Sequence, residues 1–125
     1  MSVSTRYWFI AGIYMGVIFI TSSIPGEALP EIRIWDKFLH LVEFGILSWL
    51  LGKAFRTSQK KIFIKQSAVL SIIITIFYGI TDEIHQSLVS SRYPEYYDGV
   101  FDGIGAVLAQ MIFLIKIKIR KRQNE

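Results

Sequence analysis

The sequence predicts an all-α membrane protein, a four-transmembrane-helix bundle with both termini in the cytoplasm. Three observations support this prediction. The 125-residue chain is 52% hydrophobic, and its mean hydropathy of +0.41 is too apolar for an ordinary soluble domain of this length. Its apolar residues come in blocks as long as membrane spans. Its Lys and Arg residues gather between and after these blocks, alternating from one link to the next. We expect a single domain over residues 1–125.

The first two predicted spans differ in charge. Residues 7–24 belong to Tyr7–Gly26, twenty residues without a charged side chain. At about 1.5 Å per residue, such a helix can cross a hydrocarbon core of roughly 30 Å. A cleaved signal peptide is the alternative, but Arg6 is a thin basic start and the apolar run is long. The second span, residues 34–51, carries charges in its first half only.

The last two predicted spans complete the bundle. The third covers residues 62–81, where Lys65 can extend toward the nearer surface. The fourth covers residues 98–117 and begins with acidic residues. Spans two and four are predicted in spite of their charges, because these charges lie at one end of each segment.

The basic residues predict the orientation. Eleven of the 14 Lys and Arg residues lie near the N-terminus, around the link between spans two and three, or in the C-terminal tail. The two remaining links hold only Arg33, Lys37 and Arg92. Because Lys and Arg favour the cytoplasm, we expect both termini and the middle link inside. The net charge of +4 then reflects topology, and we expect no nucleic-acid partner.

The acidic residues show a pattern that the orientation rule does not require, since acids contribute little to it. Both histidines and nine of the ten acids fall on the predicted outer side. These acids are Glu27, Glu31, Asp36, Glu43, Asp82, Glu83, Glu95, Asp98 and Asp102. The pattern indicates a polar site in the outer half of the bundle.

Helical spacing arranges these groups in stripes. The stripes consist of Asp36, His40 and Glu43 on span two, of Asp82, His85 and Gln86 on span three, and of Asp98 and Asp102 on span four. Glu83 points away from its neighbours. An ionisable side chain that faces lipid costs about 2.5 kcal/mol or more near the bilayer centre, so we expect the stripes to face one another.

Small residues suggest how the spans pack. Gly12 and Gly16 form a small-xxx-small face on span one, and Gly99 and Gly103 form another on span four. Gly105 continues the face of the two aspartates on span four. We expect these glycines to let neighbouring helices approach closely.

The combination resembles the VanZ-like family of small membrane proteins. Its elements are "DKFLHLVEFGIL", "DEIHQS", an arginine in the following loop, and "DGVFDGIGA". The matching residues are Asp36, Lys37, His40, Asp82, Glu83, Gln86, Arg92, Asp98, Asp102, Gly105 and Ala106. Asp102 stands where the family pattern more often has asparagine, and His85 is not part of the pattern.

The resemblance implies a multi-pass protein of the bacterial plasma membrane. It also implies a link to low-level resistance to teicoplanin, a lipid-tailed glycopeptide that acts on cell-wall precursors at the outer face. The expected partners are membrane lipids, and a cell-wall precursor or lipoglycopeptide. The sequence leaves the oligomeric state open.

Three functions fit these residues. The first is binding of a lipid or cell-wall-precursor head group, with Arg92 and Lys37 pairing a phosphate and the acids taking amines. Another is a purely structural role, in which Asp36 and Asp82 pair with Lys37 and Arg92 and hold the helices together.

The remaining function is that of a membrane-embedded, metal-dependent enzyme acting on a lipid head group. The sequence requires no cofactor, but histidines and carboxylates can bind a divalent metal ion. The candidate ligands are His40, Glu43, Asp82, His85, Asp98 and Asp102.

Overall fold

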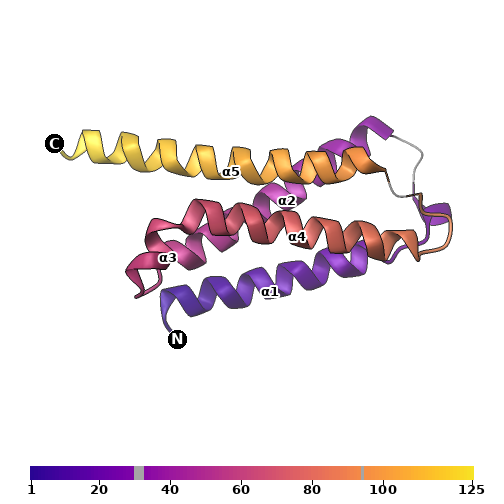
Figure 1. Ribbon diagram of the computed structural model, residues 1–125, viewed down its shortest axis with the longest axis horizontal. Coiled ribbons are helices and arrows are strands. Elements are labelled where there is room, and N and C mark those ends of the chain that lie inside the picture. The colour runs from indigo at the N-terminus through magenta and orange to yellow at the C-terminus, as the bar shows by residue number, and fades with distance from the viewer. Residues whose placement is uncertain (30–32, 94) are drawn as a thin grey trace.

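Four long helices form the protein, and two short ones lie in its links (Figure 1). The computed structural model describes residues 1–29, 33–93 and 95–125, without the side chains of residues 33–35. Glu31 and the side chain of Arg33, both placed on the outer side above, lie outside the described residues. The elements are α1 (Val3–Ser22), η1 (Gly26–Ala28), α2 (Arg33–Arg56), α3 (Lys61–Lys65), α4 (Ser67–Ser87) and α5 (Tyr96–Gln123).

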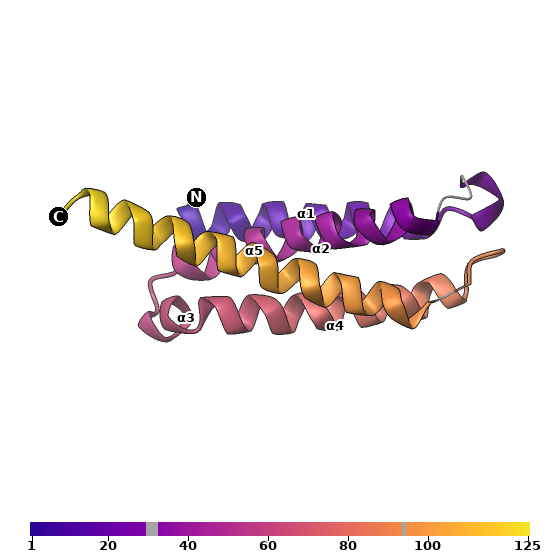
Figure 2. The ribbon, with the colours of Figure 1, turned by 90° about the horizontal axis from the view of Figure 1, so that it is seen from above.

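Helix α2 is the centre of the bundle. It packs against α1, α4 and α5, and α4 packs in turn against α1 and α5. The two views show both termini and α3 at one end, and the α1–α2 and α4–α5 links at the other (Figures 1 and 2). Phe44, Leu47 and Leu51 of α2 are buried against Ala11 and Ile18 of α1. The core is thus built mainly around one face of α2.

The outer surface of the bundle is apolar. Large side chains such as Ile20, Phe77 and Ile115 are exposed along the helices. In water, an apolar surface of this extent would be unfavourable. Each of α1, α2, α4 and α5 is long and apolar enough to cross a bilayer. The predicted all-α membrane protein with four spanning helices is therefore confirmed.

The helix boundaries differ from those predicted. Helix α1 begins at Val3, earlier than expected, and α2 continues to Arg56. The third span is displaced, because the helix breaks at Gln66 and α4 then runs from Ser67 to Ser87. The segment "DEIHQS" forms the last turns of α4, as the helical spacing of its polar residues predicts. The basic C-terminal tail continues α5 to Gln123.

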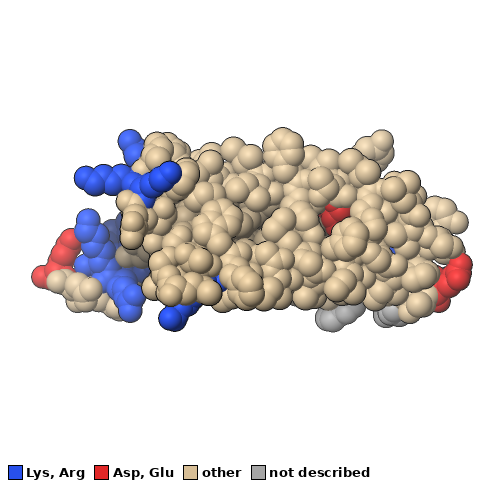
Figure 3. All heavy atoms as spheres, turned by 90° about the horizontal axis from the view of Figure 1, so that it is seen from below, with Lys and Arg blue, Asp and Glu red and all other residues tan. Residues whose placement is uncertain are grey.

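The charges are separated along the bundle. Lys and Arg gather at the end that carries the termini, and a wide band with few charges lies beyond them (Figure 3). This separation is what the alternating links predict. The structure gives the two ends of the bundle, while the side of the membrane that each faces remains an expectation.

The glycines predicted to mediate packing mostly do not. A Cβ atom added at Gly12, Gly16 or Gly99 would meet nothing within 4 Å, and one at Gly103 would only touch Ile76. No described helix therefore packs closely against Gly12, Gly16 or Gly99, and α4 only touches the face at Gly103. Gly105 does pack closely, since its Cβ would lie 2.1 Å from the carbonyl oxygen of Leu41.

The close-packing faces lie elsewhere. A Cβ atom at Gly45 would lie 3.3 Å from the carbonyl oxygen of Gly105, so α2 and α5 nearly touch there. Helix α4 buries a stripe of small residues at every fourth position, Ser67, Ser71, Thr75 and Gly79. The hydroxyl groups of Ser71 and Thr75 donate to the carbonyl groups of Ser67 and Ser71, so they leave no unpaired donor inside the bundle.

The links at the end opposite the termini are tied to each other. The amide of Gly26 donates to the carbonyl oxygen of Ser90 over 3.1 Å, and the Ser91 hydroxyl donates to Glu27. A Cβ atom at Gly26 would overlap the carbonyl group of Ser91, so only glycine fits. These contacts close the bundle over the polar half of its helices.

Candidate functional site

His40 lies at the centre of the polar half of the bundle. Its imidazole comes from α2, is 5% exposed, and has its Nδ1 atom 2.9 Å from Oδ1 of Asp102 on α5. Asp102 is 1% exposed. A hydrogen bond between two such buried groups joins α2 to α5 and fixes the orientation of the ring.

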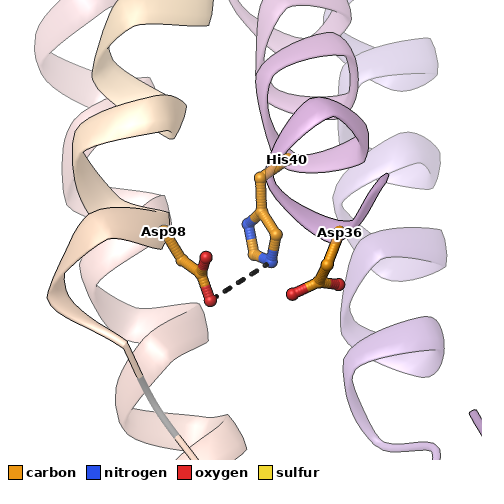
Figure 4. A group of neighbouring side chains, drawn as sticks. All are labelled: Asp36, His40 and Asp98. Carbon is orange, nitrogen blue, oxygen red and sulfur yellow. Dashed lines mark ion pairs between the residues drawn. The ribbon is translucent and has the colours of Figure 1, made fainter. Parts of the chain in front are cut away.

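The second nitrogen of His40 faces two further carboxylates. Nε2 lies 3.9 Å from Oδ2 of Asp98, which is beyond hydrogen-bonding distance. Asp36, one turn before His40 on α2, points into the same space (Figure 4). One ligand atom each from Asp36, His40 and Asp98 fit within 4.8 Å of one another. Asp98 is buried, whereas Asp36 is exposed.

Glu83 approaches His40 from α4. One ligand atom each from His40, Glu83 and Asp102 also lie within 4.8 Å of one another. Both carboxylate oxygens of Glu83 and Oδ2 of Asp102 are buried without a hydrogen-bond partner among the described residues. Glu83 does point away from Asp82 and His85, as the spacing predicts, but it points toward the cluster and not toward lipid.

Asp82 serves a different interface. It accepts hydrogen bonds from Ser22 of α1 and, over 2.9 Å, from Gln86 one turn further along α4. All three residues are buried. Asp82 therefore joins α4 to α1 and does not belong to either carboxylate group around His40.

His85 also lies against α1. Its ring stacks on Phe19 with centroids 4.3 Å apart, and its Nε2 lies 2.8 Å from the Ser23 hydroxyl. Since that hydroxyl donates to the carbonyl oxygen of Phe19, Nε2–H is the donor to Ser23. His85, one of the candidate metal ligands, is thus kept apart from the carboxylates around His40.

Lys37 and Arg92 pair differently from the expected network. Lys37 binds Glu95 across 3.1 Å. Arg92 donates to the backbone carbonyl groups of Ile24 and Thr21, at 3.1 and 3.2 Å. Arg92 therefore caps the end of α1. Neither cation forms an ion pair with Asp36 or Asp82 among the described residues, so the lock proposed in the structural hypothesis is not formed.

A cavity of about 460 Å³ opens beside His40. Its polar lining comes from α1, α2, α4 and the α4–α5 link. The polar lining residues are Tyr14, Thr21, Ser22, Asp36, His40, Glu43, Gln86 and Arg92. A separate cavity of about 510 Å³ lies between α4 and α5, where Glu83, Glu95 and Gly99 are part of the lining.

The cavity beside His40, whose lining combines polar groups with a larger apolar surface, adjoins an apolar groove. Val42 and Ile46 on the exposed face of α2 line the polar cavity and also a groove of about 320 Å³ between α2 and α5. This groove is bounded further along by Trp49, Leu108 and Ile112. The cavity and the groove therefore adjoin along the exposed face of α2.

A second buried polar group, which was not predicted from the sequence, lies toward the end with the termini. The amide of Gln110 donates to the backbone and hydroxyl oxygens of Ser48, at 2.6 and 3.0 Å. Arg56 donates to Gln110 over 2.9 Å and stacks on Phe113. Gln110 lies two turns beyond Asp102 on the same helix face, and this spacing was the available signal.

The chain matches the sequence model of a known protein family. The sequence model of the VanZ/LLP1 family matches residues 6–117, which is nearly the whole chain and includes the first span. No curated protein and no solved structure matches the chain.

Proposed function

The chain belongs to the VanZ/LLP1 family of membrane proteins, and from this premise we propose that it binds the head group of a lipid or cell-wall precursor between its helices. The observation that carries the proposal is the connection between the polar cavity and the apolar groove through Val42 and Ile46. An amphiphile needs both environments side by side, because its head group must stay hydrogen-bonded while its chains stay apolar.

The cavity lining favours a head group with both charges. Arg92 provides a positively charged side chain in the lining, which suits a phosphate. Asp36 and Glu43, about two turns apart on α2, suit an amine. We therefore propose that a phosphate and a primary amine on one head group are recognised together. Phosphatidylethanolamine carries this pair, whereas phosphatidylglycerol lacks the amine.

Native mass spectrometry of the detergent-purified chain tests this proposal. Wild type, mixed with equal amounts of the two lipids, should retain phosphatidylethanolamine preferentially. Val42→Trp should lose this adduct, because the larger side chain blocks the junction of cavity and groove. Val69→Trp on the exposed face of α4 is the matched control and should retain it. Equal retention by both variants would contradict binding in this cavity.

We propose further that occupation of the cavity protects the envelope against teicoplanin and that the chain works in the bacterial plasma membrane with both termini inside. The family resemblance and the basic links support these two statements. Expression in a glycopeptide-sensitive bacterium should raise the inhibitory concentration of teicoplanin. Val42→Trp should remove the effect, and Val69→Trp should keep it; an unchanged inhibitory concentration with wild type would refute this role.

A second candidate function is an enzyme acting on the same head group. The hydrogen bond between His40 and Asp102 favours it, because a carboxylate that orients an imidazole is the usual arrangement of a general base. Incubation with phosphatidylethanolamine vesicles, followed by mass analysis of the lipid, would then show head-group loss with wild type and none with His40→Gln. Unchanged lipid with folded wild type would exclude this activity on that lipid.

A further inference from the structure

We propose that Nε2 of His40, with the carboxylates of Asp36 and Asp98, binds a divalent transition-metal ion, and that Asp102 positions the imidazole for it. The proposal starts from the hydrogen bond of the other ring nitrogen. Nδ1 lies 2.9 Å from Asp102 Oδ1. When Nδ1 carries the proton and donates it to Asp102, Nε2 presents a lone pair toward Asp36 and Asp98. Histidines that bind metals are commonly held by a carboxylate in this manner.

The second step is that Nε2 belongs to a buried side chain and forms no hydrogen bond with the described residues. His40 is 5% exposed, and Nε2 has no hydrogen-bond partner among the described residues. Asp98, which is 4% exposed, likewise accepts no hydrogen bond from the part of the chain that the structure describes and only approaches Nε2 at 3.9 Å. A buried imidazole and a buried carboxylate that face each other at this distance leave room for an ion between them.

The third step is the charge balance. Six carboxylates lie in the half of the spanning helices that is farther from the termini. The described Lys and Arg side chains form no ion pair with them. The six are Asp36, Glu43, Asp82, Glu83, Asp98 and Asp102. Lys37 and Arg92 bind Glu95 and backbone carbonyl groups instead. A divalent cation would supply positive charge that the described Lys and Arg side chains do not.

The ligand set indicates the type of metal. Mg²⁺ and Ca²⁺ take oxygen ligands, whereas an imidazole combined with carboxylates suits Zn²⁺ or Mn²⁺. Ligand atoms of a tetrahedral zinc site are about 3.3 Å apart, given bonds of roughly 2.0 Å. The present separations lie within 4.8 Å, and the exposed Asp36 can close the difference by a change of rotamer.

The site has access to a ligand. Asp36 and His40 both line the 460 Å³ cavity, so an ion held by them would lie beside it. A phosphate in the cavity could then bind the ion. This extension rests on the proposed function, whereas metal binding by the three side chains does not.

The test measures metal binding by the full chain in detergent, without added lipid, after treatment with a chelator. Titration calorimetry with Zn²⁺ should give one ion per chain, and Mn²⁺ should give a bound signal in electron paramagnetic resonance. Asp36→Asn and Asp98→Asn should each weaken binding by at least about tenfold, and Asp102→Asn by about 10 to 100-fold as a positioning residue. Glu27→Gln, an acid outside the cluster, is the control and should bind as wild type does.

Two results would overturn the proposal. One is that folded wild type binds neither ion. The other is that Glu83→Gln loses the ion while Asp36→Asn keeps it, because the ion would then lie in the group formed by His40, Glu83 and Asp102. Asp36 is exposed, so its variant should fold even if that of Asp98 does not. If the chelated protein still retains phosphatidylethanolamine, lipid binding does not depend on the ion, and a failure of the metal proposal leaves the lipid proposal standing.

Discussion

At the scale of single residues, Asp102 has a role in stability that can be separated from its charge. Asp102→Asn keeps an acceptor oxygen for Nδ1 of His40, and asparagine is the residue that the family pattern more often has. Its free energy of unfolding should therefore stay within about 1 kcal/mol of wild type. Asp102→Ala leaves a buried donor on His40 without its partner and should cost about 1–3 kcal/mol. Reversible unfolding in mixed detergent micelles measures both, and equal losses would show that the hydrogen bond is not the stabilising feature.

Removal of the charge of Glu83 is expected to raise the free energy of unfolding, whereas Asp102→Ala lowers it. Both of its carboxylate oxygens are buried without a partner among the described residues. Burial of an unpaired charge is costly, so Glu83→Gln should raise the free energy of unfolding by about 1 kcal/mol in the metal-free protein. Glu27→Gln, in the link beyond the spanning helices, should change it little. A loss of stability in Glu83→Gln would mean that its charge has a favourable partner in the folded chain.

Residue contacts were the part of the site that the sequence predicted least well. Spacing placed Asp36 and His40 on one face, because that depends only on the helical repeat. It could not place Glu83 beside His40, since the neighbour that a helix face meets depends on how the helix is rotated in the bundle. Nor could it show that Arg92 binds backbone carbonyl groups, because every helix end offers such acceptors regardless of sequence.

At the scale of elements, the contact of α2 with α5 controls the geometry of the site. Gly105 lies against the backbone of Leu41, next to His40 and one turn from Asp102. Gly105→Ala would force the two helices apart and should cost about 1–3 kcal/mol. Gly12→Ala is the matched control, since its Cβ meets nothing within 4 Å. It should be neutral or more stable by up to about 1 kcal/mol, because alanine favours the helix.

The same unfolding assay compares the two glycine variants. A stable Gly105→Ala would show that the helices can separate there without loss, and a destabilised Gly12→Ala would show that α1 has a partner on that face. Gly12 and Gly16 illustrate why glycine spacing alone predicts packing poorly. The motif gives a flat surface, but the burial of Ser67, Ser71, Thr75 and Gly79 shows that small polar residues on another helix can provide one as well.

The spanning helices themselves were predictable, because hydropathy and length require only local sequence. Their ends were not. The break at Gln66 and the continuation of α4 to Ser87 depend on contacts that a window of apolar residues does not contain.

At the scale of the whole molecule, the expected orientation can be tested directly. The sequence has no cysteine, so a single introduced thiol reports its own position. Gln59→Cys in the α2–α3 link should be protected from a membrane-impermeant maleimide in intact cells, and Tyr93→Cys in the α4–α5 link should react. Both positions are exposed in the fold, so access depends on the membrane alone. Reaction of Gln59→Cys but not of Tyr93→Cys would show that the orientation is opposite to the expected one.

The junction at Val42 and Ile46 has a consequence for how a ligand would be found. The cavity beside His40 has Ile24 and Arg92 in its lining, and it adjoins a groove on the apolar outer surface of α2 and α5, which the proposed membrane position would turn toward lipid. A ligand that arrives by this route diffuses in two dimensions, and its supply is set by its mole fraction in the membrane. Dilution of the aqueous phase would leave occupancy unchanged, whereas dilution with inert lipid or detergent would lower it.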